Sequence, residues 1–221
     1  MSLRAVDLHK YFETAAGRIE ILRGLDLEVA AGETLAVLGE SGSGKSTLLS
    51  LLAGLDAPTR GDVEIDGRSL GAMSEGELAA FRGRELGIVF QQFHLMGGLS
   101  ALENVALPLE LQGTADALTR ARDALDQVGL SPRGDHLPAR LSGGECQRVA
   151  IARAIVVEPA LLLADEPSGS LDRRTGDAVN ALLFDLVARR GTTLVLVTHS
   201  QALAEACDRR LHLEDGRLHA R

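Results

Sequence analysis

Two periods of apolar and polar residues divide the 221-residue chain. In the first third, apolar and polar positions alternate over residues 3–12 and 19–29, which is the period of half-buried β-strands. Thr34–Leu38 is a continuous apolar run and predicts a strand buried on both faces. The other elements predicted in this third are a helix over residues 46–53 and strands over residues 62–65 and 86–90.

The middle of the chain, from about residue 91 to 158, has helical spacing of its apolar residues. Three helices are predicted there, over Ala101–Leu111, 115–128 and 143–157. Pro159 ends the last of them, because the residue before a proline disfavours helical backbone. This pattern predicts a helical insertion.

The final third alternates strand and helix. Strands are predicted over residues 161–164 and Thr193–Thr198, and helices over residues 172–189 and 200–207. Such alternation is typical of a parallel sheet with crossover helices. The chain is therefore expected to be one α/β domain over residues 1–221, with a core from residues 1–90 and 159–221 and a helical subdomain over residues 91–158.

Composition narrows the function classes. Hydrophobic residues make up 45% of the chain and aromatic residues only 3%, so an aliphatic core is expected. No apolar run reaches the roughly 20 residues that span a membrane, and the first residues lack a signal-peptide pattern, which predicts a cytoplasmic protein. A net charge of −8 argues against nucleic acid as the main partner. The 2 cysteines are too few for a disulfide framework or a zinc site.

A glycine-rich segment follows the buried strand at Thr34–Leu38. The segment from Gly39 to Ser46 matches the pattern G-x-x-x-x-G-K-[ST]. Glycines allow successive backbone N–H groups to face one anion, and the following helix adds its positive end. Lys45 is expected to reach the β- and γ-phosphates, and the Ser46 hydroxyl to ligate Mg²⁺. The alternative is a flexible turn before a helix, but the strand before the segment and the helix after it favour a nucleotide site.

The expected phosphate-binding residues are Gly39, Glu40, Ser41, Gly42, Ser43, Gly44, Lys45, Ser46 and Thr47.

Two carboxylates end the apolar run that begins at residue 161. Ligands of parallel sheets bind at the carboxyl edge, where Asp165 and Glu166 are expected. Asp165 suits a Mg²⁺ ion, and Glu166 suits polarisation of an attacking water. Taken alone, the pair also fits a solvated turn. The glycine loop upstream favours the catalytic interpretation.

The stretch from Ser142 to Arg148 resembles the signature motif of ABC-type ATPases. The order of motifs also matches that family: glycine loop, glutamine after a strand, signature, acidic strand, an Asp loop at Ser170–Asp172, and histidine. The resemblance covers essentially the whole chain. It implies a P-loop NTPase fold, with a RecA-like core containing a parallel sheet, an N-terminal antiparallel β part and a helical signature subdomain. It also implies ATP and Mg²⁺ as cofactors.

The resemblance assigns roles to several residues. Gln91 resembles the glutamine that contacts Mg²⁺ and senses the γ-phosphate, although Gln92 stands beside it. His199 resembles the histidine that contacts the γ-phosphate, whereas a lone histidine at a strand end is more often structural. Glu166, His199 and Lys45 are thus the expected catalytic residues. The expected metal ligands are Ser46, Gln91 and Asp165. The signature residues expected at a nucleotide are Ser142, Gly143, Gly144 and Glu145.

An aromatic ring that stacks on adenine is expected near the start of the chain. Tyr11 and Phe12 both offer one, and in a strand they face opposite sides. Counting back from Gly39 in related sequences favours Phe12. The alternative is that both rings are ordinary strand hydrophobes.

Within the family, the chain is similar to the MacB, LolD and YbbA group, and to YbbA most closely at residues 135–139 and 182–184. This similarity implies a subunit on the cytoplasmic face of the inner membrane that works with a separate permease of the FtsX and MacB type. Phe93, Leu95, Met96 and Leu99 follow Gln91 and are expected to form a groove for a permease helix. Ordinary subdomain core is the alternative.

The resemblance implies ATP-driven closure of a head-to-tail dimer, in which the signature of one copy completes the site of the other. A second hypothesis is a soluble ABC ATPase that acts on nucleic acid or ribosomes. No long coiled-coil insertion and no second nucleotide domain are visible in these 221 residues. A third is a module that binds ATP without hydrolysis, against which Glu166 and His199 argue.

Two positions depart from the family pattern. Ser168-Gly169-Ser170 replaces the more usual Thr-Gly-Asn, and Cys146 stands where Gln or Arg is common. Cys146 is predicted near a helix N-terminus, which would lower its pKa. Redox sensitivity of this thiol is therefore a hypothesis.

Overall fold

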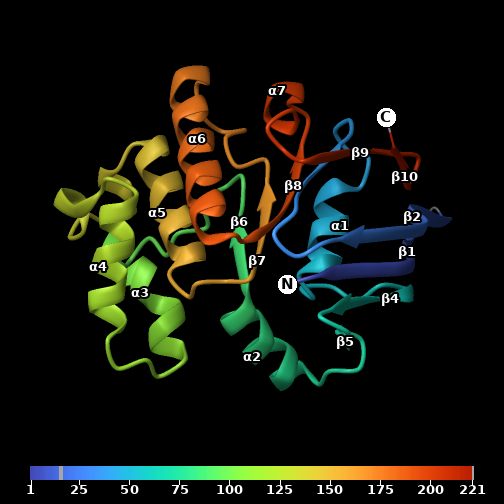
Figure 1. Cartoon of the computed structure of the whole chain (residues 1–221), viewed down its shortest axis with the longest axis horizontal. Coiled ribbons are helices and arrows are strands. Elements are labelled where there is room, and N and C mark those ends of the chain that lie inside the picture. The colour runs from blue at the N-terminus through green and yellow to red at the C-terminus, as the bar shows by residue number, and fades with distance from the viewer. Residues whose placement is uncertain (15–16, 221) are drawn as a thin grey trace. The chain divides into compact units, whose positions relative to one another are not determined.

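The computed structural model describes residues 1–14 and 17–220. The chain folds into two compact units. Figure 1 labels most of the helices and strands. Unit 1 comprises Met1–Arg82 and Thr192–Arg221, and unit 2 comprises Gly83–Gly191. The sequence predicted a different division, with subdomain boundaries at residues 90 and 159 drawn from the motifs. That division stays a prediction.

Unit 1 begins with an antiparallel sheet in the order β2-β1-β4-β5. Its strands are β1 (Leu3–Thr14), β2 (Gly17–Val29), β4 (Arg60–Ile65) and β5 (Arg68–Ser69). Leu3 lies opposite Val29 on one side and Ile65 on the other, and all three side chains are buried. The predicted alternation of apolar residues therefore supplies one face of this sheet.

Unit 1 also contains four strands in the order β10-β9-β3-β8. They are β3 (Thr34–Leu38), β8 (Thr193–Thr198), β9 (Arg209–Glu214) and β10 (Arg217–Ala220). Strand β3 is parallel to both β8 and β9. All six residues of β8 and the last four of β3 are buried, as expected for strands covered on both faces.

Three helices lie in or extend from unit 1: α1 (Lys45–Leu52), α2 (Glu75–Glu85) and α7 (Gln201–Ala204). Helix α1 has four buried leucines and was predicted. Helix α2 was not predicted. Phe81 is its only buried residue, so its sequence lacks a periodic apolar face.

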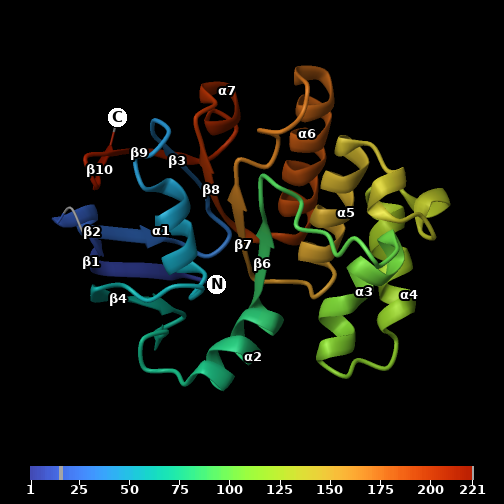
Figure 2. The same ribbon diagram turned by 180° about the vertical axis from the view of Figure 1, so that it is seen from behind.

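Unit 2 combines two parallel strands with four helices. The strands are β6 (Leu86–Val89) and β7 (Leu161–Asp165), which lie side by side in Figure 2. The helices are α3 (Ala101–Leu111), α4 (Ala117–Gln127), α5 (Gly143–Ile155) and α6 (Arg173–Arg190), with 3-10 turns at Ser131–Arg133 and Pro138–Arg140. Helix α5 packs against α3, α4 and α6 and has nine buried residues, so it is central to this unit.

Two differences from the predicted elements have clear causes. The helix predicted over residues 200–207 is wrong beyond Ala204, because Asp208 is tied to the start of β3 by bonds of 2.9 and 2.8 Å from the Thr34 N–H and hydroxyl. The hairpins β4–β5 and β9–β10 were also missed. Both turn on Asp-Gly pairs with positive φ, at Asp66-Gly67 and Asp215-Gly216, which is a recognisable hairpin signal.

Over the described parts of the chain, residues 1–14 and 17–220, no helix is both long and apolar enough to cross a membrane.

Candidate functional site

The glycine loop of unit 1 connects β3 to α1. Gly42 and Gly44 have φ values of 83° and 99°, a backbone conformation that side chains disfavour. A Cβ on Gly44 would also lie 2.8 Å from Cγ2 of Ile21. Gly44 is the N-cap of α1 and offers no capping side chain, and the first turn holds no acidic residue. The helix N–H groups are thus available to an anion.

Lys45 folds back across this loop. Its Nζ donates to the carbonyl oxygens of Gly39 at 2.8 Å and Glu40 at 2.7 Å, and the residue is only 7% exposed. Within the described residues, the Ser43 hydroxyl is buried with no hydrogen-bond partner. A buried ammonium and an unsatisfied hydroxyl in one glycine loop match the needs of a bound phosphate chain.

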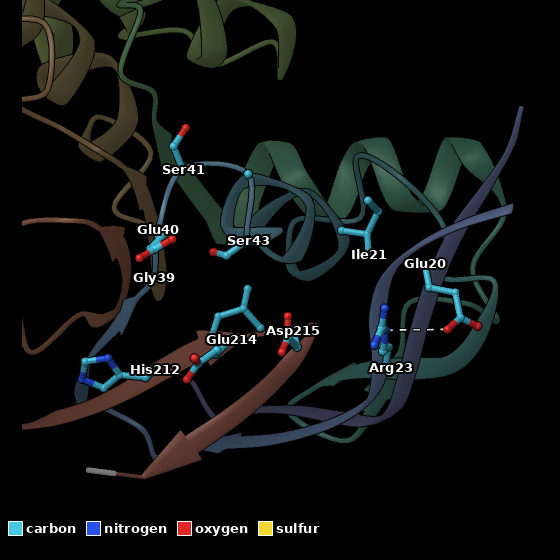
Figure 3. A pocket seen from close by; sticks show the side chains of 13 residues that line it. Glu20, Ile21, Arg23, Gly39, Glu40, Ser41, Ser43, His212, Glu214 and Asp215 are labelled. Carbon is cyan, nitrogen blue, oxygen red and sulfur yellow. Dashed lines mark ion pairs between the residues drawn. The ribbon is translucent and has the colours of Figure 1, made fainter. Parts of the chain in front are cut away.

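A cavity of about 570 Å³ opens beside the first half of the loop (Figure 3). Its walls are loop residues 39–43, Glu20, Ile21 and Arg23 of β2, and residues 212–216 of the β9–β10 hairpin. Four carboxylates line it, those of Glu20, Glu40, Glu214 and Asp215, against the single guanidinium of Arg23. The net negative charge of this cavity disfavours a phosphate. The α1 end of the loop suits a phosphate better.

His199 belongs to the same edge of unit 1 as the glycine loop. Strands β3 and β8 are parallel with Leu38 paired to Thr198, so Gly39 and His199 are the next residues on neighbouring strands. Thr198 is fully buried and His199 is exposed. The carboxyl ends of adjacent parallel strands place the histidine and the loop side by side.

Tyr11 and Phe12 lie near the β1–β2 hairpin in different surroundings. The Arg18 guanidinium stacks on the Tyr11 ring at 3.5 Å, so one face of that ring is covered. Phe12 is 46% exposed, with Lys10 Nζ at 5.1 Å from its ring centre. Phe12 is therefore the more accessible ring.

Unit 2 brings the glutamine and the acidic pair together. Strands β6 and β7 are parallel with Val89 paired to Ala164, so Gln91 and Asp165 follow at the same edge. The Ser170 hydroxyl donates to the Gln91 carbonyl at 3.1 Å, and a Cβ on Gly169 would lie 2.9 Å from Gln91 Nε2. Glu166 has a φ of 43°. Such strained backbone is often found at functional sites.

The signature serine caps helix α5. The Ser142 hydroxyl accepts from the Glu145 N–H at 3.3 Å, and the Glu145 carboxylate accepts from the Ser142 N–H at 2.8 Å. This is a capping box. The pKa of Glu145 is lowered most by the hydrogen bond from the Ser142 N–H, next by that from the Ser142 hydroxyl, and least by Arg133. A Cβ on Gly144 would lie 2.4 Å from Cγ2 of Thr175, so glycine permits close packing against α6.

The hypothesis of a reactive Cys146 thiol fails on its premise. Burial, and then the charge of Glu145, raise the pKa of Cys146. Its Sγ donates to the Pro138 carbonyl at 3.6 Å. Burial favours the neutral thiol here, contrary to the lowered pKa predicted from the helix N-terminus. Burial likewise raises the pKa of Cys207 to about 11.

The expected site residues thus form two sets. Unit 1 holds the glycine loop and His199, and unit 2 holds Gln91, the acidic pair and the signature. Sequence reasoning missed Gln147 and Arg153 of α5, which bond to the main chain around Gln91. A signal was present for Arg153, because it is the only polar residue in the apolar run from Val149 to Ile155.

Comparisons with known proteins identify a family and relatives that match this chain. A family model described as ABC transporter matches residues 22–169. The chain is 52% identical over 212 residues to the lipoprotein-releasing system ATP-binding protein LolD of Nitratidesulfovibrio vulgaris, covering 95% of this chain and 91% of LolD. It is 53% identical over 202 residues to the uncharacterized ABC transporter ATP-binding protein YbbA of Escherichia coli K12, covering 90% and 89%.

Solved structures give the same picture. A dimeric structure of MJ0796, a bacterial ABC transporter cassette, matches with a TM-score of 0.91 and 38% identity, covering 98% of this chain and 96% of that one. A dimeric post-hydrolysis state of the same cassette, bound to ADP and Pi, matches with a TM-score of 0.90 and 37% identity, with the same coverage.

Proposed function

Since this chain belongs to the ABC transporter family, we propose that it drives a separate membrane permease of the FtsX and MacB type by closure of a head-to-tail dimer. The chain is an ATPase, the ATP-binding subunit of an ABC transporter, and ATP drives its dimerisation. The proposal adds the kind of permease, the orientation of the dimer and a place on the cytoplasmic face of the inner membrane.

One observation carries the dimer proposal: two helices of the chain, α1 and α5, begin in glycine-containing backbone. The first is α1 after the glycine loop, and the second is α5, which Ser142 caps. A nucleotide held by the loop of one copy would meet Ser142, Gly143 and Gly144 of the other. Each copy would therefore supply half of two sites, and neither half would complete a site alone.

The residues of the loop fit a triphosphate. The backbone of the left-handed glycines, the Lys45 ammonium and the orphaned Ser43 hydroxyl are donors within one loop. The oxygen donors proposed for Mg²⁺ are the Ser46 hydroxyl of unit 1, and the Asp165 carboxylate and the Gln91 amide of unit 2. In the part of the chain that the structure describes, no three His, Cys, Asp or Glu side chains gather as a metal site. When bound, Mg²⁺ would neutralise charge on the phosphates.

Hydrolysis is assigned to groups at the two strand edges. Lys45 would neutralise charge on the β- and γ-phosphates, and Glu166 would accept a proton from the attacking water. His199 would hold the γ-phosphate beside the loop. We assign the choice of substrate to the permease rather than to this subunit.

The adenine ring is assigned to Phe12, and this assignment can be tested directly. Phe12→Ala is expected to weaken ATP binding about tenfold, since stacking of a base on a ring is worth roughly 1–3 kcal/mol. Tyr11→Ala is expected to leave ATP affinity nearly unchanged, because Arg18 already covers a face of Tyr11. Equilibrium binding of ATP to both variants decides the matter. The opposite ranking would transfer the adenine to Tyr11.

The permease is assigned to the segment after Gln91. Asn104, fully buried, bonds to the Met96 N–H at 2.8 Å and to the carbonyls of Met96 and Leu99 at 3.1 and 3.0 Å. These bonds hold the segment while the Met96 side chain stays 55% exposed. Phe93 is half-buried and a Cβ on Gly143 would lie 3.7 Å from its ring, so Met96 is the better position to change.

Met96→Asp is expected to abolish recruitment of the chain to membranes that carry its permease, while ATP hydrolysis by the free protein is unchanged. A charge in an apolar groove is left desolvated, which weakens docking. Leu111→Asp is the matched control, because Leu111 is 80% exposed on the same helical part of unit 2. Sedimentation with membranes measures recruitment. Full recruitment of Met96→Asp would remove the docking assignment.

A further inference from the structure

The main chain that carries Gln91 is held by side chains from elsewhere in unit 2. Gln147 of α5 donates to the Phe90 carbonyl at 3.2 Å, and Ser170 donates to the Gln91 carbonyl at 3.1 Å. Arg153 of α5 donates to the carbonyls of Phe93 at 2.9 Å and His94 at 2.6 Å. Four of the five carbonyls between residues 90 and 94 are therefore bound by a side chain.

Arg153 is suited to this task by its shape. Its planar guanidinium reaches two neighbouring carbonyls with separate nitrogens, Nη1 and Nη2, which a lysine ammonium cannot match in geometry. Burial lowers the pKa of Arg153, so the charge is held in a partly desolvated place. His94, one of its two partners, has a φ of 47°. A left-handed non-glycine residue is strained, and the two bonds offset that strain.

Gln147 supports the same turn from the buried side. It is fully buried, its Nε2 bonds to Phe90, and its Oε1 has no hydrogen-bond partner among the described residues. An unsatisfied buried oxygen costs stability and would favour a smaller apolar residue if packing were the only requirement. The bond to Phe90 is the contact that such a residue would lose.

We propose that Arg153, assisted by Gln147 and Ser170, is a positioning residue that sets the Gln91 side chain for its contact with the γ-phosphate and Mg²⁺. The proposal rests on the function proposed above for Gln91. Helix α5 begins with the signature and ends near Arg153, so one rigid element would hold the signature at one end and orient Gln91 from the other.

Arg153→Lys tests the proposal, because it keeps the charge and the stem but loses the fork. We expect kcat to fall about tenfold, since small misplacement of a catalytic group has such effects. The Mg²⁺ concentration for half-maximal rate should rise severalfold, while ADP affinity without Mg²⁺ stays unchanged. Arg190→Lys is the matched control, as Arg190 donates to the Ile155 carbonyl at 2.8 Å away from this turn.

Hydrogen exchange provides a readout that does not depend on activity. In Arg153→Lys the amides of residues 90–96 should exchange faster, whereas Arg190→Lys and Gln91→Ala should leave them unchanged. Unchanged exchange in Arg153→Lys would overturn the proposal. Faster exchange with unchanged kcat and Mg²⁺ dependence would overturn it as well. If Gln91→Ala itself hydrolyses ATP normally, the role proposed for Gln91 fails instead.

A double variant separates positioning from general loosening. If Arg153 acts through Gln91, Arg153→Lys adds no loss of kcat to Gln91→Ala. If the losses of kcat from the two single variants multiply in the double variant, Arg153 acts elsewhere and the proposal is overturned. Ser170→Ala is a second test should Arg153→Lys unfold. Ser170 is exposed, and its replacement by alanine removes only the bond to the Gln91 carbonyl. The same rise in Mg²⁺ requirement is expected, and its absence counts against the proposal.

Discussion

Glu166→Gln is expected to lower the rate of ATP hydrolysis by about 10²- to 10⁴-fold, the range that general bases contribute. The amide keeps the shape of the side chain but cannot accept the proton of the attacking water. ATP binding should persist, because the glycine loop of unit 1 is untouched. Since ATP drives dimerisation, the variant should accumulate as an ATP-bound dimer.

Phosphate release and analytical ultracentrifugation with ATP measure the two effects. Glu158→Gln is a close control, because Glu158 and Glu166 flank the same strand β7 and both have positive φ, 54° and 43°. Glu158 instead makes an exposed ion pair with Arg120 at 3.4 Å, so its amide variant should hydrolyse ATP normally. Rapid turnover by Glu166→Gln would remove Glu166 as the base.

Lys45→Met should weaken ATP binding about 10- to 100-fold, because a hydrogen bond to a charged group is worth roughly 1.5–3 kcal/mol. The methionine fills similar space but carries no charge for the phosphates. Stability should change little, since the carbonyls that Lys45 releases lie in a loop where water can reach them. Equilibrium binding and thermal unfolding of the same preparation separate these effects.

The chain's other lysine offers the reverse result. Lys10 is 8% exposed, and its Nζ lies 2.7 Å from Asp56 Oδ2 and 2.8 Å from the Ala57 carbonyl. Lys10→Met should lower the free energy of unfolding by about 1–2 kcal/mol, because Asp56 is partly exposed and water moderates the loss. ATP affinity should stay within a few fold of the parent. Equal loss of ATP binding in both variants would contradict the special role of Lys45.

The buried strands were the most predictable elements. Strands β3 and β8 and helix α3 have the predicted bounds, because continuous apolar runs and capped apolar helices leave few alternatives. The helix α2 escaped because one buried phenylalanine gives no period. The hairpin β9–β10 escaped although its Asp-Gly turn was visible, because its strands carry few apolar residues.

The candidate site follows the same division. The glycine loop, the acidic pair and the signature were recognisable because each needs particular residues at fixed spacing. The sequence was less informative about which of these residues lie beside one another in the fold. The register of β3 with β8 puts His199 beside the loop, and the stacking of Arg18 on Tyr11 distinguishes two adjacent rings. Neither contact follows from position in the chain.

The sequence by itself determined the family and the ATPase chemistry, and it supplied the residues proposed to carry that chemistry, because motif spacing encodes local backbone geometry. Only the tertiary structure decided how those residues are supported. Cys146 lies at a helix N-terminus as expected, yet burial raises its pKa. Arg153 follows Gln91 by sixty-two positions along the chain, yet its guanidinium donates to two carbonyls of the turn that follows Gln91. Burial and long-range hydrogen bonds depend on which segments fold against each other, and no local pattern contains that information.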